Sequence, residues 1–139
     1  MESLKERVDA IEECYEFMLA YAAQGLPGDQ GSSSGSQLRQ LLGRAVDALS
    51  GLAGAYAVAA QEGNLEPASC YDSFLAVLAR DAGDSLAALE LVQAQPTLSS
   101  QLIDNLNASI HLRALLTDIF LIDEILKLRN PVSNAISSE

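Results

Sequence analysis

Apolar residues recur every three or four positions near the start of the chain, at successive steps of 4, 3, 4, 3 and 4. This spacing places them on one stripe of an α-helix and predicts a helix from about Leu4 to Gln24. The helix is expected to end where Gly25, Pro27 and Gly28 follow one another closely. The residues of the stripe are Leu4, Val8, Ile11, Tyr15, Met18 and Ala22.

The glycine- and serine-rich residues 25–36 are expected to form a flexible loop, because residues 29–36 hold no side chain that could anchor a core. Ser36 is the expected N-cap of a second helix, whose apolar heptad runs from Leu38 to Ala59. Gly51 and Gly54 lie within that heptad, and each costs a helix about 1 kcal/mol. The two glycines therefore indicate close packing of a neighbouring helix or space for a ligand.

Two more helices are expected in the second half of the chain. The first runs from about Pro67 to Gln95, because proline suits a first helical turn and the proline after Gln95 ends the helix. The second begins after a cap at Thr97 or Ser99 and continues without interruption to about Arg129, where an Asn-Pro pair stops it.

Four amphipathic helices with short connections favour an all-α fold, an antiparallel up-down four-helix bundle. The expected single domain spans residues 1–131, and residues 132–139 form a short polar tail. The first helix is shorter than the others by more than a turn, so one end of the bundle is expected to be open near the Gly/Ser loop.

Apolar residues from Leu115 to Leu128 cover more than one stripe of the last helix, which is wider than a four-helix core requires. This width predicts that the bundle forms a homodimer through that helix. The residues expected at the interface are Leu115, Ile119, Phe120, Ile122 and Leu126.

Composition and charge narrow the possible partners. The chain has 139 residues, 49% of them hydrophobic, and a formal net charge of -11. The electrostatic field of this negative net charge repels phosphate backbones and anionic lipid headgroups, so neither nucleic acid nor a membrane is an expected partner. No run approaches the roughly 20 apolar residues of a spanning helix, and the first residues carry carboxylates in place of a secretory signal. The sequence therefore predicts a cytoplasmic protein.

Carboxylates form a second stripe on the first helix, at steps of 4, 3, 4 and 3. Like charges at this spacing repel one another by a few tenths of a kcal/mol per pair unless cations neutralise them. The stripe is either a solvated face or a surface that binds a basic partner. Its members are Glu2, Glu6, Asp9, Glu13 and Glu16.

Metal and cofactor chemistry finds little support in the sequence, and no cofactor is expected. A di-iron bundle needs two Glu-x-x-His motifs, but His111 is the single histidine and Ala108 stands three residues before it. Cys14 and Cys70 lack the C-x-x-C spacing of redox and zinc motifs, so both are expected to be small buried hydrophobes.

An acidic helical bundle with one histidine resembles the histidine phosphotransfer domains in architecture. Those domains have a Lys-Gly pair shortly after the histidine, roughly His-x-Leu-Lys-Gly. Here Arg113, Ala114 and Leu115 occupy the corresponding positions, and Leu115 stands where glycine belongs. Phosphotransfer on His111 is one alternative function.

A ligand pocket between the first three helices is another alternative. Its polar determinant would be an arginine or the histidine, and Arg44 and Arg113 could likewise pair with carboxylates or hold an anion. The residues of this pocket are Tyr15, Met18, Gly51, Gly54, Tyr56, Arg80 and His111.

The leading hypothesis is a small, acidic, non-enzymatic interaction module, such as an adaptor, assembly factor or regulator. It would form a homodimer and bind a basic protein partner. The alternative is a helical bundle that binds a small organic ligand or cofactor, with or without catalysis.

Overall fold

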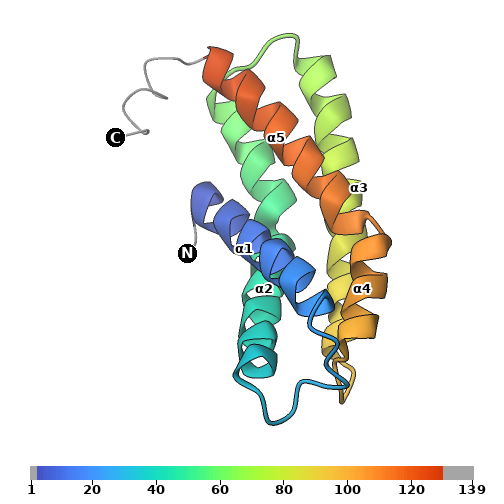
Figure 1. Cartoon of the computed structure of the whole chain (residues 1–139). Helices are drawn as coiled ribbons and strands as arrows, with labels where there is room; N and C mark the ends of the chain where they lie inside the picture. The colour runs from blue at the N-terminus through green and yellow to red at the C-terminus, as the bar shows by residue number, and fades with distance from the viewer. Residues whose placement is uncertain (1–2, 130–139) are drawn as a thin grey trace.

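The computed structural model describes residues 3–129 and contains five α-helices, with no strand in that range (Figure 1). This confirms the predicted all-α class, but these residues form five helices where four were expected. The helices are α1 (Leu4–Ala22), α2 (Ser33–Glu62), α3 (Ala68–Gln93), α4 (Ser100–Ala108) and α5 (His111–Arg129).

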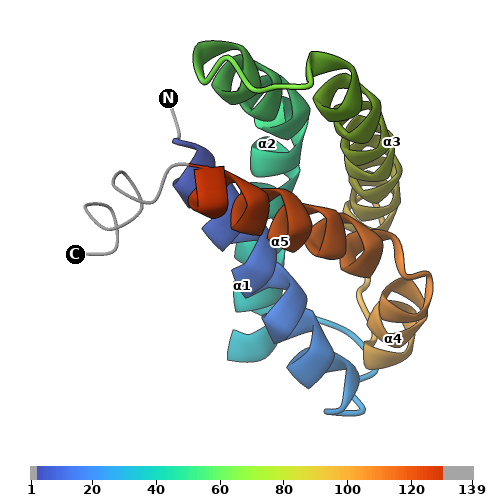
Figure 2. The same ribbon diagram turned by 90° about the horizontal axis from the view of Figure 1, so that it is seen from above.

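The helices form two layers around one core. Figure 2 shows α2 and α3 side by side in one layer and α1, α4 and α5 in the other. Helix α1 packs mainly on α2 and α4, and α5 packs mainly on α3. The largest fully buried side chains come from all five helices and the connection before α4, and include Tyr21, Tyr56, Leu78, Leu98, Ile103 and Leu115.

The start of α2 differs from the prediction. The helix is capped by Ser32, whose hydroxyl accepts a hydrogen bond from the backbone amide of Gly35 at 2.9 Å, and not by Ser36. Residues 33–36 are therefore helical. Gly35 is buried, and a Cβ atom there would lie 2.0 Å from the carbonyl oxygen of Asp29. The first turn of α2 is thus pressed against the preceding loop, where only glycine fits.

The expected long last helix is interrupted, and this prediction was wrong. Ser109 and Ile110 separate α4 from α5, and Ile110 adopts a left-handed backbone conformation with φ of 62°. Figure 1 shows the change of direction between the two helices. No glycine or proline lies between residues 100 and 129, so no helix-breaking residue explains the interruption. The break arises from tertiary contacts, because α4 packs against α1 and α5 packs against α3.

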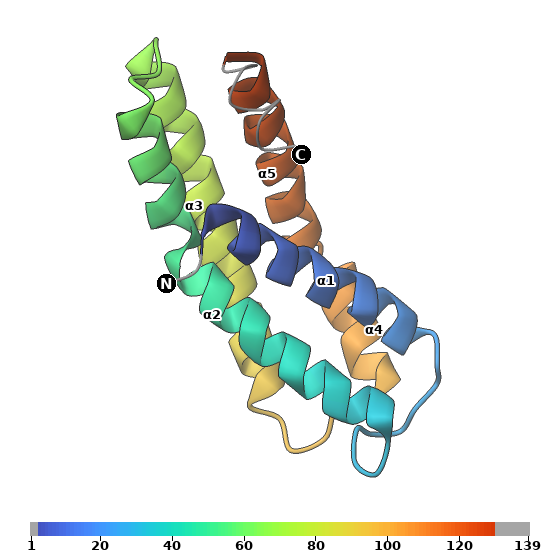
Figure 3. The ribbon, with the colours of Figure 1, turned by 90° about the vertical axis from the view of Figure 1, so that its left-hand side faces the viewer.

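The open end of the molecule lies opposite to the one predicted. Arg7, in the first turns of α1, donates hydrogen bonds to the carbonyl oxygens of Asp47 and Ala48 near the middle of α2. The rest of α2 extends past the start of α1 by about ten residues, or roughly 15 Å. Among the described residues, α2, α3 and α5 form the end of the molecule at the α2–α3 connection, and α1 does not reach it (Figures 1 and 3).

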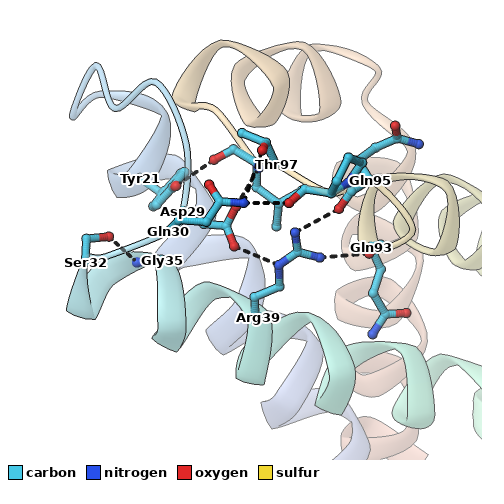
Figure 4. A network of polar contacts seen from close by, with 11 residues as sticks. Tyr21, Asp29, Gln30, Ser32, Gly35, Arg39, Gln93, Gln95 and Thr97 are labelled. Atoms are coloured by element: carbon cyan, nitrogen blue, oxygen red, sulfur yellow. Dashed lines mark hydrogen bonds and ion pairs between the residues drawn. The ribbon is translucent and has the colours of Figure 1, made fainter.

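A polar network closes the other end, beside the Gly/Ser loop (Figure 4). The guanidinium of Arg39 donates to the carboxylate of Asp29 at 2.9 Å and to the carbonyl oxygens of Gln93 and Gln95 at 2.8 Å each. Asp29 in turn accepts from the backbone amide of Leu98 at 2.7 Å. The loop expected to be flexible is therefore attached to the α3–α4 connection. Arg39 also holds the pKa of Asp29 below its usual value.

Replacing Arg39 by alanine is expected to lower the free energy of unfolding by about 2–4 kcal/mol. The variant leaves the Asp29 carboxylate and two carbonyl oxygens without their donor. Arg44→Ala is the matched control, because Arg44 forms an exposed ion pair with Glu13 and its loss should cost at most about 1 kcal/mol. Urea unfolding followed by circular dichroism measures both, and equal losses would contradict the role given to Arg39.

Candidate functional site

An apolar groove runs between α3 and α5 at the open end of the molecule, where α1 does not reach. Its volume is about 460 Å³. The first turns of α3 form one wall and the last turns of α5 form the other. The groove is lined by Glu66, Pro67, Cys70, Tyr71, Phe74, Leu121, Ile122, Ile125, Leu128 and Arg129.

Helical spacing builds both walls of the groove. Leu121, Ile125 and Leu128 follow one another at steps of four and three, so they share a face of α5. Leu121 is 52% exposed and Leu128 is 74% exposed. Since α1 begins lower in the molecule, no helix of the described chain covers this face. The apolar excess seen in the sequence of the last helix is thus divided among the core, this groove and the exposed side chain of Phe120.

Arg129 lines the groove beside the connection between α2 and α3. Its guanidinium donates a hydrogen bond to the carbonyl oxygen of Glu66 and lies 5.9 Å from the centre of the Tyr71 ring. A cation over an aromatic face is attracted by the ring quadrupole. Arg129 therefore joins the end of α5 to the start of α3.

A second recess adjoins the groove and is more polar. It shares Glu66 and Tyr71 with the groove and also contains Asp72 and Asn64, and its volume is about 330 Å³. The combined surface is an apolar groove with two carboxylates on its α3 side. This arrangement suits a ligand that has both an apolar face and positive charge.

Most of the predicted acidic stripe has partners within the chain. Glu6 accepts from the backbone amide of Ser3 at 3.1 Å, Asp9 pairs with Lys5 at 2.8 Å, and Glu13 pairs with Arg44 at 2.8 Å. Glu16 lines a recess between α1 and α5, and Glu2 lies outside the described residues. Two carboxylates of this exposed stripe, Asp9 and Glu13, are thus paired with cations of the same chain.

The predicted dimer interface is divided between the core and the surface. Leu115, Ile119 and Ile122 are buried inside the single chain, and Leu126 is half-buried. Only Phe120 of this set is strongly exposed, at 54%. Those three side chains are therefore part of the hydrophobic core of the single chain.

The pocket proposed between the first three helices is not assembled. Met18 and Tyr56 are core residues, and the Tyr56 hydroxyl donates to Asp123 at 2.8 Å. A Cβ atom on Gly51 would lie 2.7 Å from the guanidinium of Arg7, so this glycine permits close packing, as one of the two interpretations had it. Gly54 faces open space.

The remaining candidates of that pocket lie apart from one another on the surface. Arg80 is exposed on α3, and His111 is exposed at the first position of α5. Tyr15 lines the recess between α1 and α5 together with Arg113, so Arg113 does not point into the core. Arg44 is likewise exposed. Arg39, which the sequence analysis did not single out, is the arginine that α2 directs inward.

The two cysteines are free, but only Cys14 is buried as expected. Burial raises the pKa of its thiol to about 12. Cys70 is exposed and forms part of the wall of the groove, so its predicted burial was wrong.

Comparison with known protein families, curated proteins and solved structures finds no match to this chain. Within residues 3–129, no group of three or more histidine, cysteine or acidic side chains is placed to hold a metal ion. None of the described helices combines the length and apolar character needed to cross a bilayer.

Asp118 of α5 makes stability depend on pH. Burial of its carboxyl group and the neighbouring Asp81 of α3 raise its pKa from 3.8 to about 7, and its Oδ2 atom is buried without a hydrogen-bond partner among the described residues. Between about pH 4 and pH 7, the folded protein therefore keeps a proton on the Asp118 carboxyl group that the unfolded chain releases. Stability should fall as the pH rises from about 4 to about 7.

Asp118→Asn is expected to make this fall in stability with pH less steep and to raise the urea midpoint at pH 8 relative to the wild type, since an amide carries no charge to bury. Burial also raises the pKa values of Glu12 and Asp123, so part of the dependence should remain. Asp104→Asn, at an exposed position of α4, removes the same formal charge and is the matched control. Urea midpoints measured at intervals from pH 4 to pH 8 provide the test. A wild-type and an Asp118→Asn profile of the same slope would contradict it.

Proposed function

We propose that this chain is a small acidic interaction module of the cytoplasm, without catalytic chemistry, that binds an amphipathic helix of a basic protein in the groove between α3 and α5. The observation that carries the proposal is the position of the groove. It lies where α1, because it starts halfway along α2, leaves an apolar face of α5 without a covering helix.

The shape of the groove favours a helix as the occupant. The walls are themselves helices, and the residues of the α5 wall recur at heptad-like steps. An amphipathic helix recognises such a groove with anchors at positions i, i+3 or i+4, and i+7. Bound there, it would complete the covering layer that α1 begins.

Charge favours a basic helix. The chain carries a net charge of -11, which attracts cationic partners over a distance and speeds their association. Glu66 and Asp72 lie beside the groove and can receive lysine or arginine side chains at the edge of the bound helix.

A synthetic peptide of about 18 residues, roughly five helical turns, serves as the probe. It carries leucine at heptad positions and lysine on its polar face. The peptide is expected to bind the full chain in isothermal titration calorimetry. A scrambled peptide of the same composition, and one with glutamate in place of lysine, should not bind.

The double variant Leu121→Lys with Leu128→Lys is expected to weaken binding of the lysine peptide at least about tenfold, because it removes two anchoring contacts and adds positive charge. The double variant Leu91→Lys with Val58→Lys is the matched control, since both residues are exposed outside the groove and the added charge is the same. If both double variants weaken binding equally, the peptide responds to net charge alone and the groove is not the binding site.

A further inference from the structure

Ile110, between α4 and α5, holds an unfavourable backbone conformation. Its φ of 62° lies in the left-handed region, which is disfavoured for residues other than glycine and most strongly for β-branched ones. The other non-glycine residue with positive φ among those described is Asn64, and asparagine tolerates this region. The side chain of Ile110 is 58% exposed, so little burial compensates for the strain.

Helix α5 also begins without a side-chain cap of the usual kind. Ser3, Ser32 and Ser99 accept hydrogen bonds from the first turns of α1, α2 and α4, whereas α3 follows Pro67 and likewise has no side-chain cap. At α5, the carbonyl of Ile110 accepts from Ala114 at 2.8 Å, but an isoleucine side chain cannot accept from the free amides of the first turn. In a continuous helix these amides would find partners on α4.

The local sequence prefers such a continuous helix, and tertiary contacts prevent it. Residues 100–129 contain neither glycine nor proline. The Ser100 hydroxyl donates to the carbonyl oxygen of Tyr21 at 2.7 Å, and the Asn107 amide donates to that of Met18 at 3.2 Å, which holds α4 on α1. Helix α5 packs on α3 instead. The strain at Ile110 is thus a conflict between local preference and packing within one chain.

We propose that Ile110 is a hinge through which two copies of this chain exchange α5. In the exchanged dimer, α4 and α5 join into one helix, and α5 occupies the place on α3 of the other copy. The contacts of α5, including the hydrogen bond between Tyr56 and Asp123, form again between the copies. The backbone strain at Ile110 is relieved in both copies, and helical hydrogen bonds form across the hinge. Short, strained connections of this kind favour domain swapping.

This inference is independent of the peptide-binding function. The groove keeps the same residues in the exchanged dimer, where α3 and α5 simply come from different copies. Loss of peptide binding would therefore not affect the hinge, and absence of a dimer would not affect the groove.

Refolding of the full chain from urea at millimolar concentration, followed by size-exclusion chromatography with light scattering, provides the test. The wild type is expected to give monomer and a dimer that persists for hours after dilution, because dissociation requires α5 to leave its site. Ile110→Gly relaxes the bent form and disfavours the straight helix. The association constant of its dimer should therefore be at least about tenfold lower than that of the wild type. Ile110→Ala also removes the side chain but favours the straight helix, and it should dimerise at least as well as the wild type.

Phe120→Asp separates exchange from simple surface association. Phe120 is exposed on α5, so a dimer held by the outer face of that helix would be lost in this variant, while an exchanged dimer should persist. Three results would overturn the proposal: a wild-type chain that stays monomeric after concentrated refolding, equal dimerisation of Ile110→Gly and Ile110→Ala, or a dimer that Phe120→Asp abolishes.

Discussion

The hydrogen bonds from Arg7 to the carbonyl oxygens of Asp47 and Ala48 fix the height of α1 along α2, and Gly51 leaves the space that the guanidinium occupies. The remaining architecture depends on this position. Below it, α1 and α4 complete a closed layer over α2 and α3. Above it, α5 alone faces the hairpin of α2 and α3, so its outer apolar residues have no covering helix.

Sequence periodicity predicted the class of the fold and most helix ends, because apolar spacing and capping residues are local signals. The start at Leu4 and the end near Arg129 agree with the structure. The break at Ile110 had no such signal, since its cause is the divergent packing of α4 and α5. Apolar spacing and capping residues also did not distinguish Ser32 from Ser36 as the cap of α2. The helix begins at Ser33 because Gly35 lets the first turn pack against the backbone of Asp29.

The candidate site could be predicted only in part, for a similar reason. The broad apolar surface of the last helix was visible in the sequence, but which of its side chains turn inward depends on how α5 lies on α3. Leu115 and Ile119 turned out to be core residues, and Leu121 and Leu128 line the groove. The role of Arg39 was hidden because its carbonyl partners lie 54 and 56 residues further along the chain.

The contrast between the two cysteines has a practical consequence for the study of this protein. Cys14 lies in the core with a thiol that stays protonated, and Cys70 is exposed on the wall of the groove. A thiol-reactive dye should therefore attach at Cys70 alone, without any substitution in the natural sequence. The fluorescence of a dye on Cys70 would change when a ligand binds in the groove. The natural sequence therefore already contains a labelling site for an optical binding sensor.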